Sequence, residues 1–164
     1  MPKSTRPVIV AVIGGSKATT EERARAETVG RKLARAGAVL ICGGRGGVMA
    51  AACRGAKSAG GLTIGVMSGP DASEANPYVD LPIVSGIGEA RNTIIIRSAH
   101  AAVAVGGSYG TLSEIAFCLS FGLPVVGLGT WHVERESHPP VPIHRASSAE
   151  EAAELALELA RQRS

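Results

Sequence analysis

Three glycine-rich segments each follow a short apolar stretch, and segments of this kind can bind anions through the backbone. They are Gly14-Gly15-Ser16, Gly43-Gly44-Arg45-Gly46-Gly47 and Gly106-Gly107-Ser108-Tyr109-Gly110-Thr111. Glycine lets a ligand approach the main chain closely. The free N–H groups in the first turn of a helix, together with the helix dipole, favour an anion such as phosphate. The second and third segments run into predicted helices, so the pattern predicts a phosphate-binding site.

Two familiar phosphate-binding motifs are absent from the sequence. There is no G-x-x-x-x-G-K-[ST], so no P-loop lysine is available to reach a nucleoside triphosphate. No G-x-G-x-x-G follows any predicted strand, which argues against a conventional NAD or FAD site. The ligand is therefore expected to carry one phosphate or a diphosphate, held by backbone amides and hydroxyl groups. The alternative is that each segment is a tight strand-to-helix turn without a ligand.

Two charged side chains near the third segment are candidates for contact with such a ligand. A carboxylate at Glu114 would orient water and stabilise an oxocarbenium-like transition state at the ribose of a nucleotide. The alternative is structural, since Thr111-x-x-Glu114 matches the capping box that opens a helix. Arg91 offers a guanidinium that binds phosphate or carboxylate with two hydrogen bonds. Taken as an isolated residue, it would more simply pair with Glu89 or Asp80 on the surface.

Other polar residues have two interpretations each. The hydroxyl groups of Ser108 and Thr111 would bind phosphate or cap a helix, and Arg45 would either complement an anion or be solvated. Three histidines recur every six residues in a proline-containing segment, a spacing that suits neither a helical nor a hairpin metal site. No metal site is therefore predicted at His132, His138 and His144.

Strand-length apolar runs alternate with helical patterns along the whole chain. The predicted strands lack polar alternation, as expected for strands covered on both faces; they are Pro7–Ile13, Ala38–Cys42, Leu62–Met67, Ala101–Val105 and Pro124–Leu128. Helices are predicted at about 20–36, 47–59, 88–99, 111–121 and 148–162. Thr19 with Glu22 and Ser148 with Glu151 match capping boxes. Glycine stands where two of the helices should end, at Gly37 and Gly122.

This alternation predicts an α/β protein with a Rossmann-like, doubly wound and mainly parallel sheet, and with helices on both faces. The length of 164 residues predicts one nucleotide- or phosphate-binding domain over residues 1–164. In such a sheet the three glycine-rich turns lie along one edge, where ligands bind. Two longer segments interrupt the alternation, Ser68–Gly86 and Gly129–Ser147. Each is a candidate lid, ligand-facing loop or oligomer contact.

Composition argues against several classes of partner. The 17 Lys and Arg residues exceed the 14 Asp and Glu residues by only three, and aromatic residues make up 3% of the chain. The chain therefore has neither the excess of basic residues nor the number of aromatic side chains for base stacking that nucleic-acid-binding proteins usually have. No apolar run approaches the roughly 18 to 20 residues needed to cross a bilayer. Neither nucleic acid nor a membrane is therefore predicted as a partner.

The cysteines and the N-terminus bear on cellular location. An odd number of cysteines without a CxxC argues against a disulfide framework and for a reducing compartment; they are Cys42, Cys53 and Cys118. Lys3 and Arg6 precede the apolar stretch Val8–Ile13, but this stretch is shorter than the roughly 7 to 15 residues of a signal-peptide core. We interpret it as a first buried strand and expect a cytoplasmic protein.

The segment Gly106–Glu114 resembles the PGGxGTxxE motif of the Lonely Guy (LOG) family, formerly described as lysine decarboxylases. The resemblance covers most of the chain, with GGS after the first strand, CGGRGGVM after the second and EARN at Glu89–Asn92. Within the superfamily the chain looks most similar to short bacterial proteins that group with molybdenum cofactor carrier proteins. Departures from the LOG pattern are Gly106 for proline, Ser108 for the second glycine and Asn92 for lysine.

The resemblance implies a Rossmann-like fold, a homodimer or homotetramer, and roles for particular residues. Arg91 and Glu114 match the catalytic arginine and glutamate of LOG enzymes, which cleave the N-glycosidic bond of cytokinin riboside monophosphates. Phosphate binding is implied for Gly107, Gly110 and Thr111. The full set of expected ligand-binding residues is Gly14, Gly15, Ser16, Gly43, Gly44, Gly46, Gly47, Asn92, Gly106, Gly107, Ser108, Tyr109, Gly110 and Thr111.

Three functional hypotheses from different classes follow. The leading hypothesis is a binding protein for a phosphorylated, nucleotide-like small molecule, either the molybdenum cofactor or a nucleoside monophosphate. It is favoured because three amide-rich turns converge without an obvious pair of catalytic carboxylates. The alternative is a hydrolase, a LOG-type nucleoside 5′-monophosphate phosphoribohydrolase. A third hypothesis is a homo-oligomeric scaffold whose pocket no longer binds a ligand.

Overall fold

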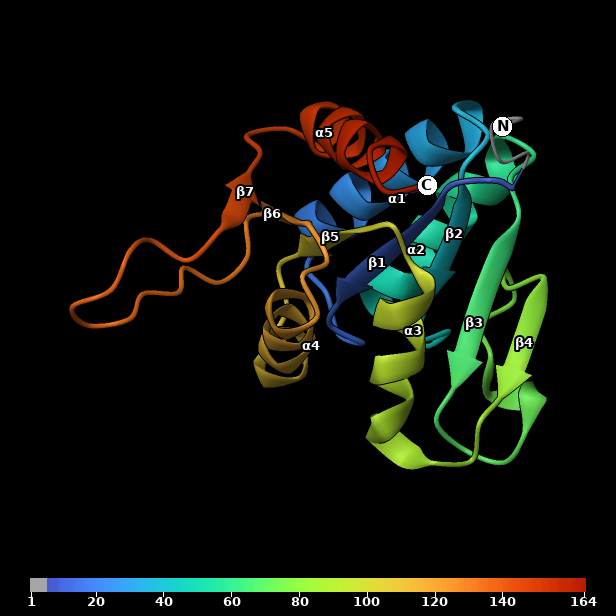
Figure 1. Cartoon of the computed structure of the whole chain (residues 1–164). Helices are drawn as coiled ribbons and strands as arrows, with labels where there is room; N and C mark the ends of the chain where they lie inside the picture. Colours follow the sequence, from blue (N-terminus) through green and yellow to red (C-terminus); the bar gives the residue numbers. More distant parts are fainter. Residues whose placement is uncertain (1–5) are drawn as a thin grey trace.

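A computed structural model describes residues 6–164 of the chain, so Lys3 lies outside the described residues. Seven parallel strands form one sheet in the order β4-β3-β2-β1-β5-β6-β7 (Figure 1). The strands are β1 (Ile9–Gly14), β2 (Val39–Cys42), β3 (Thr63–Met67), β4 (Leu81–Val84), β5 (Ala101–Val105), β6 (Val125–Leu128) and β7 (Ile143–Arg145). The predicted Rossmann-like α/β fold is confirmed, and the sheet is parallel throughout.

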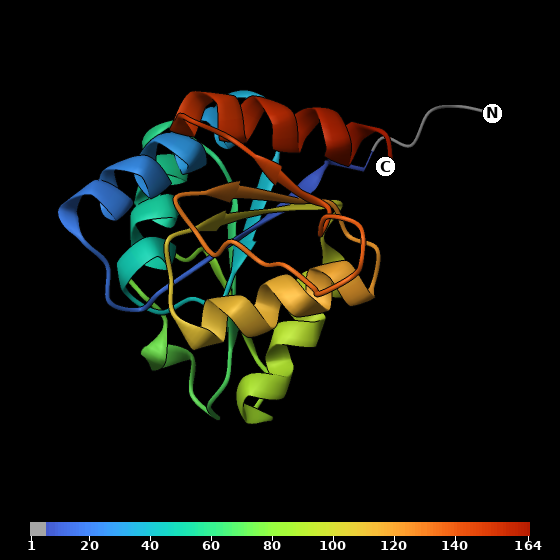
Figure 2. The ribbon, with the colours of Figure 1, turned by 90° about the vertical axis from the view of Figure 1, so that its left-hand side faces the viewer.

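Five α-helices cover the two faces of this sheet. Figure 2 shows the sheet between two helical layers. One layer holds α1 (Thr20–Arg35), α2 (Gly47–Ser58) and α5 (Ala149–Arg161), and the other holds α3 (Asn92–Ser98) and α4 (Tyr109–Ser120). Alternate residues of each central strand enter opposite cores, as the strand period of two requires. All five helices overlap their predicted ranges.

Strand β1 illustrates this alternation. Val10 and Val12 belong to the core beneath α1, α2 and α5, whereas Ala11 and Ile13 belong to the core beneath α3 and α4. All four are at most 1% exposed. Because both faces are covered, a continuous apolar run was the correct signal for this strand.

The predicted helix ends are largely confirmed. Thr19 and Glu22 form the full reciprocal capping box of α1, with bonds of 3.1 and 2.9 Å. Ser148 accepts from the Glu151 amide, but the Glu151 carboxylate bonds to the amide of Ser147 instead of that of Ser148. The second box is therefore only half formed.

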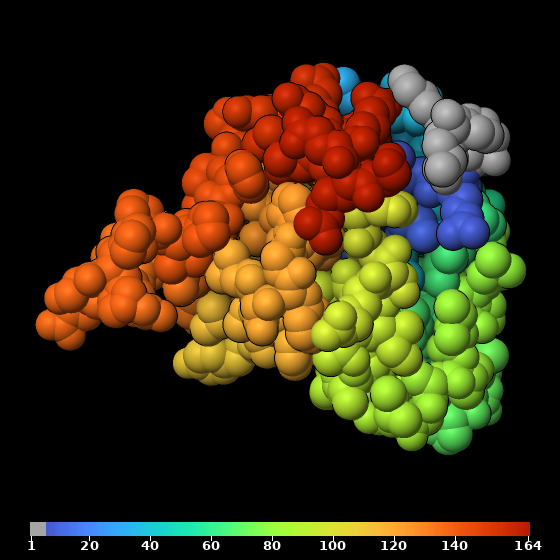
Figure 3. All heavy atoms as spheres, viewed as in Figure 1, coloured from blue at the N-terminus to red at the C-terminus, as the bar shows by residue number. Residues whose placement is uncertain are grey.

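The two longer segments each contain an edge strand that the sequence analysis missed. Ser68–Gly86 includes β4, and Gly129–Ser147 includes β7. Strand β4 contains Pro82 and is exposed along its length, which is tolerated because an edge strand has one unpaired side. Strand β7 has only three residues. The middle of the segment between β6 and β7 projects from the body as an extended arm (Figure 3), whereas Trp131, Val133 and Val141 pack against the core.

The strand order places a switch point between β1 and β5. After β1 the chain moves outward through β2, β3 and β4, then returns to β5 on the other side of β1. Gly14 at the end of β1 pairs in register with Val105 at the end of β5. The turns that follow these two strands therefore begin side by side, at the edge where open α/β sheets bind ligands.

Among the helices of residues 6–164, none combines the length and apolar character required to cross a bilayer.

Candidate functional site

A cavity of about 120 Å³ lies at this switch point. Its lining comes from the turns after β1, β2 and β5, and from the starts of α3 and α4. Nine of the residues expected from the sequence line it: Gly14, Gly15, Ser16, Arg91, Asn92, Ser108, Gly110, Thr111 and Glu114. Arg45 also lines the cavity, as do Glu89, considered from the sequence as a partner of Arg91, and Met49, which no sequence argument singled out. The fold thus brings together three turns that are far apart in sequence.

The remaining expected residues do not line this cavity. Gly107 borders an adjacent cavity of about 370 Å³ that shares Gly15, Ser16 and Ser108 with the first. Gly47 borders a third cavity, between α1 and α2. Gly43 contacts the site indirectly, through Arg91. The others belong to the same turns but do not line the first cavity: Gly44, Gly46, Gly106 and Tyr109.

Arg91 is held by backbone carbonyl groups and not by a carboxylate. It ends the short 3₁₀ helix η2 (Gly88–Arg91), and the residue is only 3% exposed. Its Nη1 donates to the carbonyl of Gly43 at 2.7 Å and also to that of Val66. The Nε atom is buried without a hydrogen-bond partner. Burial lowers the pKa of Arg91 below its ordinary value, although the nearby carboxylate of Glu89 opposes this effect.

Gly43 is required by this arrangement. A Cβ atom at position 43 would lie 2.6 Å from Nη1 of Arg91, too close for any real contact. The glycine of the second turn therefore makes room for the guanidinium, in addition to any role toward a ligand. Gly43 was predicted to contact phosphate directly, but in the structure its contact is with the Arg91 guanidinium, which lies beside the cavity.

Asn92 is the second buried polar group at the cavity. It begins α3, directly after Arg91, and is 4% exposed. Its Oδ1 atom has no hydrogen-bond partner. Buried polar groups in folded proteins are almost always satisfied, and an unpaired one costs about 1 to 3 kcal/mol. Two adjacent residues lining the same cavity, each with an unpaired buried atom, point to a polar ligand.

Glu114 does not cap the helix that carries it. Helix α4 begins at Tyr109 with Ser108 as its N-cap, two residues earlier than predicted. Glu114 consequently falls beyond the first turn, and the capping-box interpretation of Thr111 and Glu114 is wrong. Burial raises the pKa of Glu114 to about 7, even though Arg91 acts in the opposite direction. A carboxyl group in this range exchanges protons near neutral pH.

The start of α4 faces both cavities. Ser108 makes no side-chain capping bond, so its hydroxyl does not occupy the N–H groups of the first turn. Gly107 has a φ of +91°, and a Cβ atom there would lie 2.1 Å from Oγ1 of Thr111. Glycine at 107 thus allows the chain to enter the helix with its first N–H groups directed at the edge of the sheet.

Arg45 lies at the mouth of the cavity and is paired with Glu89. Its Nη2 is 3.0 Å from Oε1 of Glu89 and also contacts the hydroxyl of Ser68. Both members of the pair are partly exposed. The turn itself is held by Asn76, whose side chain donates to the carbonyl groups of Gly44 and Arg45 at 3.2 and 2.9 Å.

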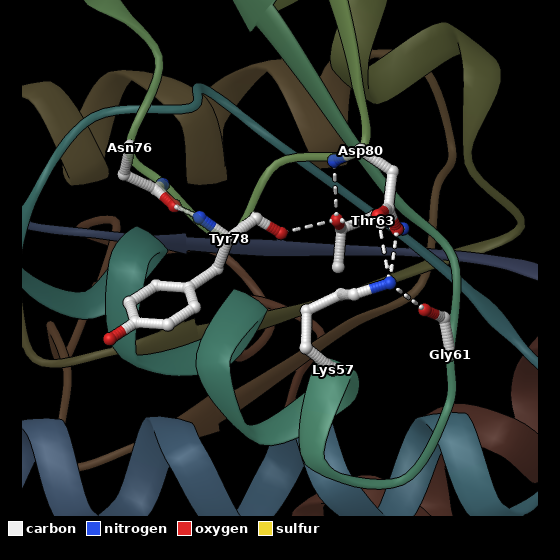
Figure 4. Close-up of polar contacts among 6 residues, drawn as sticks. All are labelled: Lys57, Gly61, Thr63, Asn76, Tyr78 and Asp80. Atoms are coloured by element: carbon white, nitrogen blue, oxygen red, sulfur yellow. Dashed lines mark hydrogen bonds and ion pairs between the residues drawn. The ribbon is translucent and has the colours of Figure 1, made fainter.

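Asp80, considered as a partner of Arg91, lies elsewhere and has a structural role (Figure 4). Its carboxylate accepts from the Thr63 amide at 3.0 Å and pairs with the Lys57 ammonium at 2.7 Å. The Thr63 hydroxyl in turn donates to the carbonyl of Tyr78. Although burial opposes it, the Lys57 and Thr63 donors lower the pKa of Asp80. Glu89 is therefore the second carboxylate of the cavity.

One further residue was missed because nothing in its sequence context marks it. Trp131 follows β6, and its Nε1 donates to the carbonyl of Ser108 at 3.0 Å. Its ring lies 5.7 Å from the ring of Tyr109, with 32° between the planes. Only the pairing of β5 with β6 brings the two turns together.

The site gathers two guanidinium groups, two carboxyl groups, hydroxyls and the N-terminus of α4. These are the kinds of group that recognise phosphate in proteins through charge and hydrogen bonds, and an ionisable carboxyl group lies among them. The fold and this polar cavity define a Rossmann-like α/β protein with a site at the switch point of its sheet. Residues 7–160 match the SLOG cluster4 family, and the chain belongs to that family.

Solved structures of similar proteins agree with this assignment. A molybdenum cofactor binding protein from Rippkaea orientalis is 34% identical, with a TM-score of 0.86 over 95% of this chain and 99% of that one. The molybdenum cofactor carrier protein of Chlamydomonas reinhardtii is 38% identical, with a TM-score of 0.83 over 94% and 98%. An uncharacterised protein of Archaeoglobus fulgidus is 43% identical over 73% of this chain and 78% of its own length.

Proposed function

We propose that this protein binds a phosphorylated, nucleotide-like small molecule and is a carrier of the molybdenum cofactor type. The observation that carries the proposal is the pair Arg91 and Asn92. Each is more than nine-tenths buried, lines the cavity and has an unpaired polar atom. The similarity to molybdenum cofactor binding and carrier proteins supports the choice of ligand.

The residues have distinct tasks in this proposal. The first-turn N–H groups of α4 and the hydroxyls of Ser108 and Thr111 hold the phosphate. Arg91 supplies a positive charge to the same group, and Asn92 supplies an amide that hydrogen-bonds to the ligand. Glu114, neutral below a pH of about 7, avoids repelling an anion.

Isothermal titration calorimetry with AMP, GMP and molybdopterin tests the proposal. We expect binding of at least one of them, and a loss of about tenfold or more in Arg91→Ala, since charge-assisted hydrogen bonds contribute about 1.5 to 3 kcal/mol. Arg97→Ala is the matched control, because Arg97 packs over the ring of Phe121 and does not line the cavity. The absence of both heat and thermal shift with all three ligands would reject the proposal.

A second candidate function is cleavage of the N-glycosidic bond of a nucleoside 5′-monophosphate. It is favoured by Glu114, whose pKa of about 7 suits proton transfer, and by Glu89, which supplies a second carboxylate in the same cavity. Glu114 would protonate the base nitrogen as the C1′–N bond breaks, and water would form the new C1′–O bond and return a proton to the Glu114 carboxylate. The products would be a free base and ribose 5-phosphate.

Chromatography of AMP and GMP incubated with the protein tests this activity. Release of free base that is lost in both Glu114→Gln and Arg91→Ala would establish it with these roles. Turnover that is unchanged in both variants would remove Arg91 and Glu114 from the reaction. Binding without turnover would leave the carrier function.

We also propose that the chain forms a homodimer or homotetramer through the β4 edge. Five apolar side chains around this edge are each at least 42% exposed: Leu62, Leu81, Ile83, Val84 and Ile87. An exposed edge strand with apolar side chains is a template for pairing. Light scattering should show an oligomer that Ile83→Lys converts to a monomer; a monomeric wild-type protein would contradict the proposal.

A further inference from the structure

Tyr109 is far more exposed than its position would require. It is the first residue of α4, between Ser108 and Gly110, which both line the cavity. The residue is 80% exposed, compared with 36% for Tyr78, the other tyrosine of the chain. Keeping an aromatic ring in water forgoes the stabilisation of burial. The exposed part of the ring is therefore free to contact a molecule held at the start of α4.

Trp131 gives this ring a fixed support. The segment after β6 passes beside α4 (Figure 2), and the Trp131 indole donates to the carbonyl of Ser108 at 3.0 Å. Trp131 is half-buried and packs against the core beneath α3 and α4. The 5.7 Å separation of the rings places Tyr109 against Trp131. The Tyr109 ring thus lies against the Trp131 ring, and Trp131 is itself hydrogen-bonded to Ser108, which lines the cavity.

The size of the cavity leaves part of a nucleotide-like ligand outside it. Its volume of about 120 Å³ is well below the roughly 300 to 1,000 Å³ typical of pockets for ligands of that size. The adjacent cavity is lined by Gly15, Ser16, Lys17, Glu22, Gly107 and Ser108, none of which has an apolar side chain. Met49 is the one apolar side chain in the linings of the two cavities, so these surfaces suit a phosphate and a sugar better than the face of an aromatic ring.

We propose that Tyr109, backed by Trp131, is the stacking subsite for a planar nitrogen heterocycle, a purine or a pterin, of the ligand whose phosphate binds at the start of α4. The inference rests on the proposed function and defines its ligand as a phosphate joined to an aromatic ring. Stacking is tolerant of ring identity because every such ring has a π face. Selection between purine and pterin then falls to other contacts.

The test separates ring-bearing from ringless ligands. AMP and molybdopterin are the ring-bearing probes, and ribose 5-phosphate is the ringless probe. Tyr109→Ala should weaken a ring-bearing probe about tenfold, the order expected for loss of one aromatic stack. It should change the affinity for ribose 5-phosphate less than twofold. Tyr109→Phe should restore binding, and Tyr78→Ala, which removes the other tyrosine ring, should have no effect.

A second measurement uses the unaltered protein. Trp131 is the only tryptophan in the sequence, so the protein's indole emission reports on this subsite alone. A ring-bearing probe should change the emission, and ribose 5-phosphate should not.

Two outcomes would count against the subsite in different ways. Full affinity for the ring-bearing probes in Tyr109→Ala, or an equal loss for ringed and ringless probes, overturns the subsite and leaves the proposed function standing. Failure of AMP, GMP and molybdopterin to bind at all overturns the proposed function, and the subsite with it.

Discussion

The guanidinium of Arg91 donates a 2.7 Å hydrogen bond to the carbonyl of Gly43, which lies 48 residues earlier in the chain. This bond joins the turn after β2 to the start of α3 across the cavity. It also fixes the arginine so that Nε remains without a partner in the protein. One side chain therefore links two segments of the site that are far apart in sequence.

Arg91→Lys should separate the effect of the guanidinium hydrogen bonds from the effect of the positive charge. Lysine keeps the positive charge but lacks the planar guanidinium. The buried carbonyl groups of Gly43 and Val66 would therefore lose the hydrogen-bond donor that Arg91 Nη1 provides. We expect the free energy of unfolding to fall by about 1 to 3 kcal/mol and AMP or molybdopterin affinity to fall about tenfold or more. Urea titration and calorimetry measure the two effects. Arg97→Lys should change the affinity little, and an Arg91→Lys protein that binds normally would contradict the assignment.

Glu114 should make stability fall as the pH rises. Its pKa is raised from 4.5 to about 7 in the folded protein, so the folded state binds the proton more tightly than the unfolded state. The stabilisation is full below pH 4.5 and is lost as the pH rises to about 7. The loss should be about 3 kcal/mol at most. Affinity for an anionic ligand should fall over the upper part of the same range.

Glu114→Gln is the measurement that isolates this effect. The variant cannot ionise at this position, so its free energy of unfolding should depend less on pH than that of the wild type. The difference between the two urea-denaturation curves, measured from pH 4 to 8, removes the contribution of every other group. Parallel pH profiles would show that Glu114 titrates normally.

Glu89→Gln should strengthen anion binding. Glu89 pairs with Arg45 at the mouth of the cavity, and its negative charge competes with an incoming phosphate. Because exposed ion pairs contribute about 0.2 to 1 kcal/mol, affinity should rise by a factor of about 1.4 to 5. Glu136→Gln makes the same change of charge in the projecting arm, away from the cavity lining, and is the control. Weaker binding in Glu89→Gln would instead indicate that this carboxylate contacts the ligand.

Gly107→Ala should destabilise the protein and abolish binding. Position 107 has a φ of +91°, and the new methyl group would collide with Thr111. We expect a loss of about 2 kcal/mol or more, combining strain with the clash. Gly122→Ala is a matched control, because its φ of +67° is also positive but no atom lies within 4 Å of the new Cβ. It should cost less, about 1 kcal/mol, and leave binding intact. Thermal denaturation with and without ligand distinguishes the two.

Five of the seven strands, most of the helix ends and the three glycine-rich turns could be predicted from the sequence alone. Those features are local: an apolar run such as Ala101–Val105, or the pairing of Thr19 with Glu22, acts within a few residues and leaves a readable pattern. The two edge strands were not predicted from the sequence. Strand β4 contains Pro82 and is exposed, and β7 is very short, so neither forms the buried apolar run that marks the other strands.

Which of the candidate residues lie close together depends on the packed fold. In the folded protein Asp80 lies away from the cavity, and Glu89 lines it. The Gly43 carbonyl accepts a hydrogen bond from Arg91, and the Trp131 indole donates one to the Ser108 carbonyl. The raised pKa of Glu114 depends on burial, a property of the packed protein that no motif encodes. Contacts between distant segments arise from strand order and register, so residue type and spacing along the chain do not specify them.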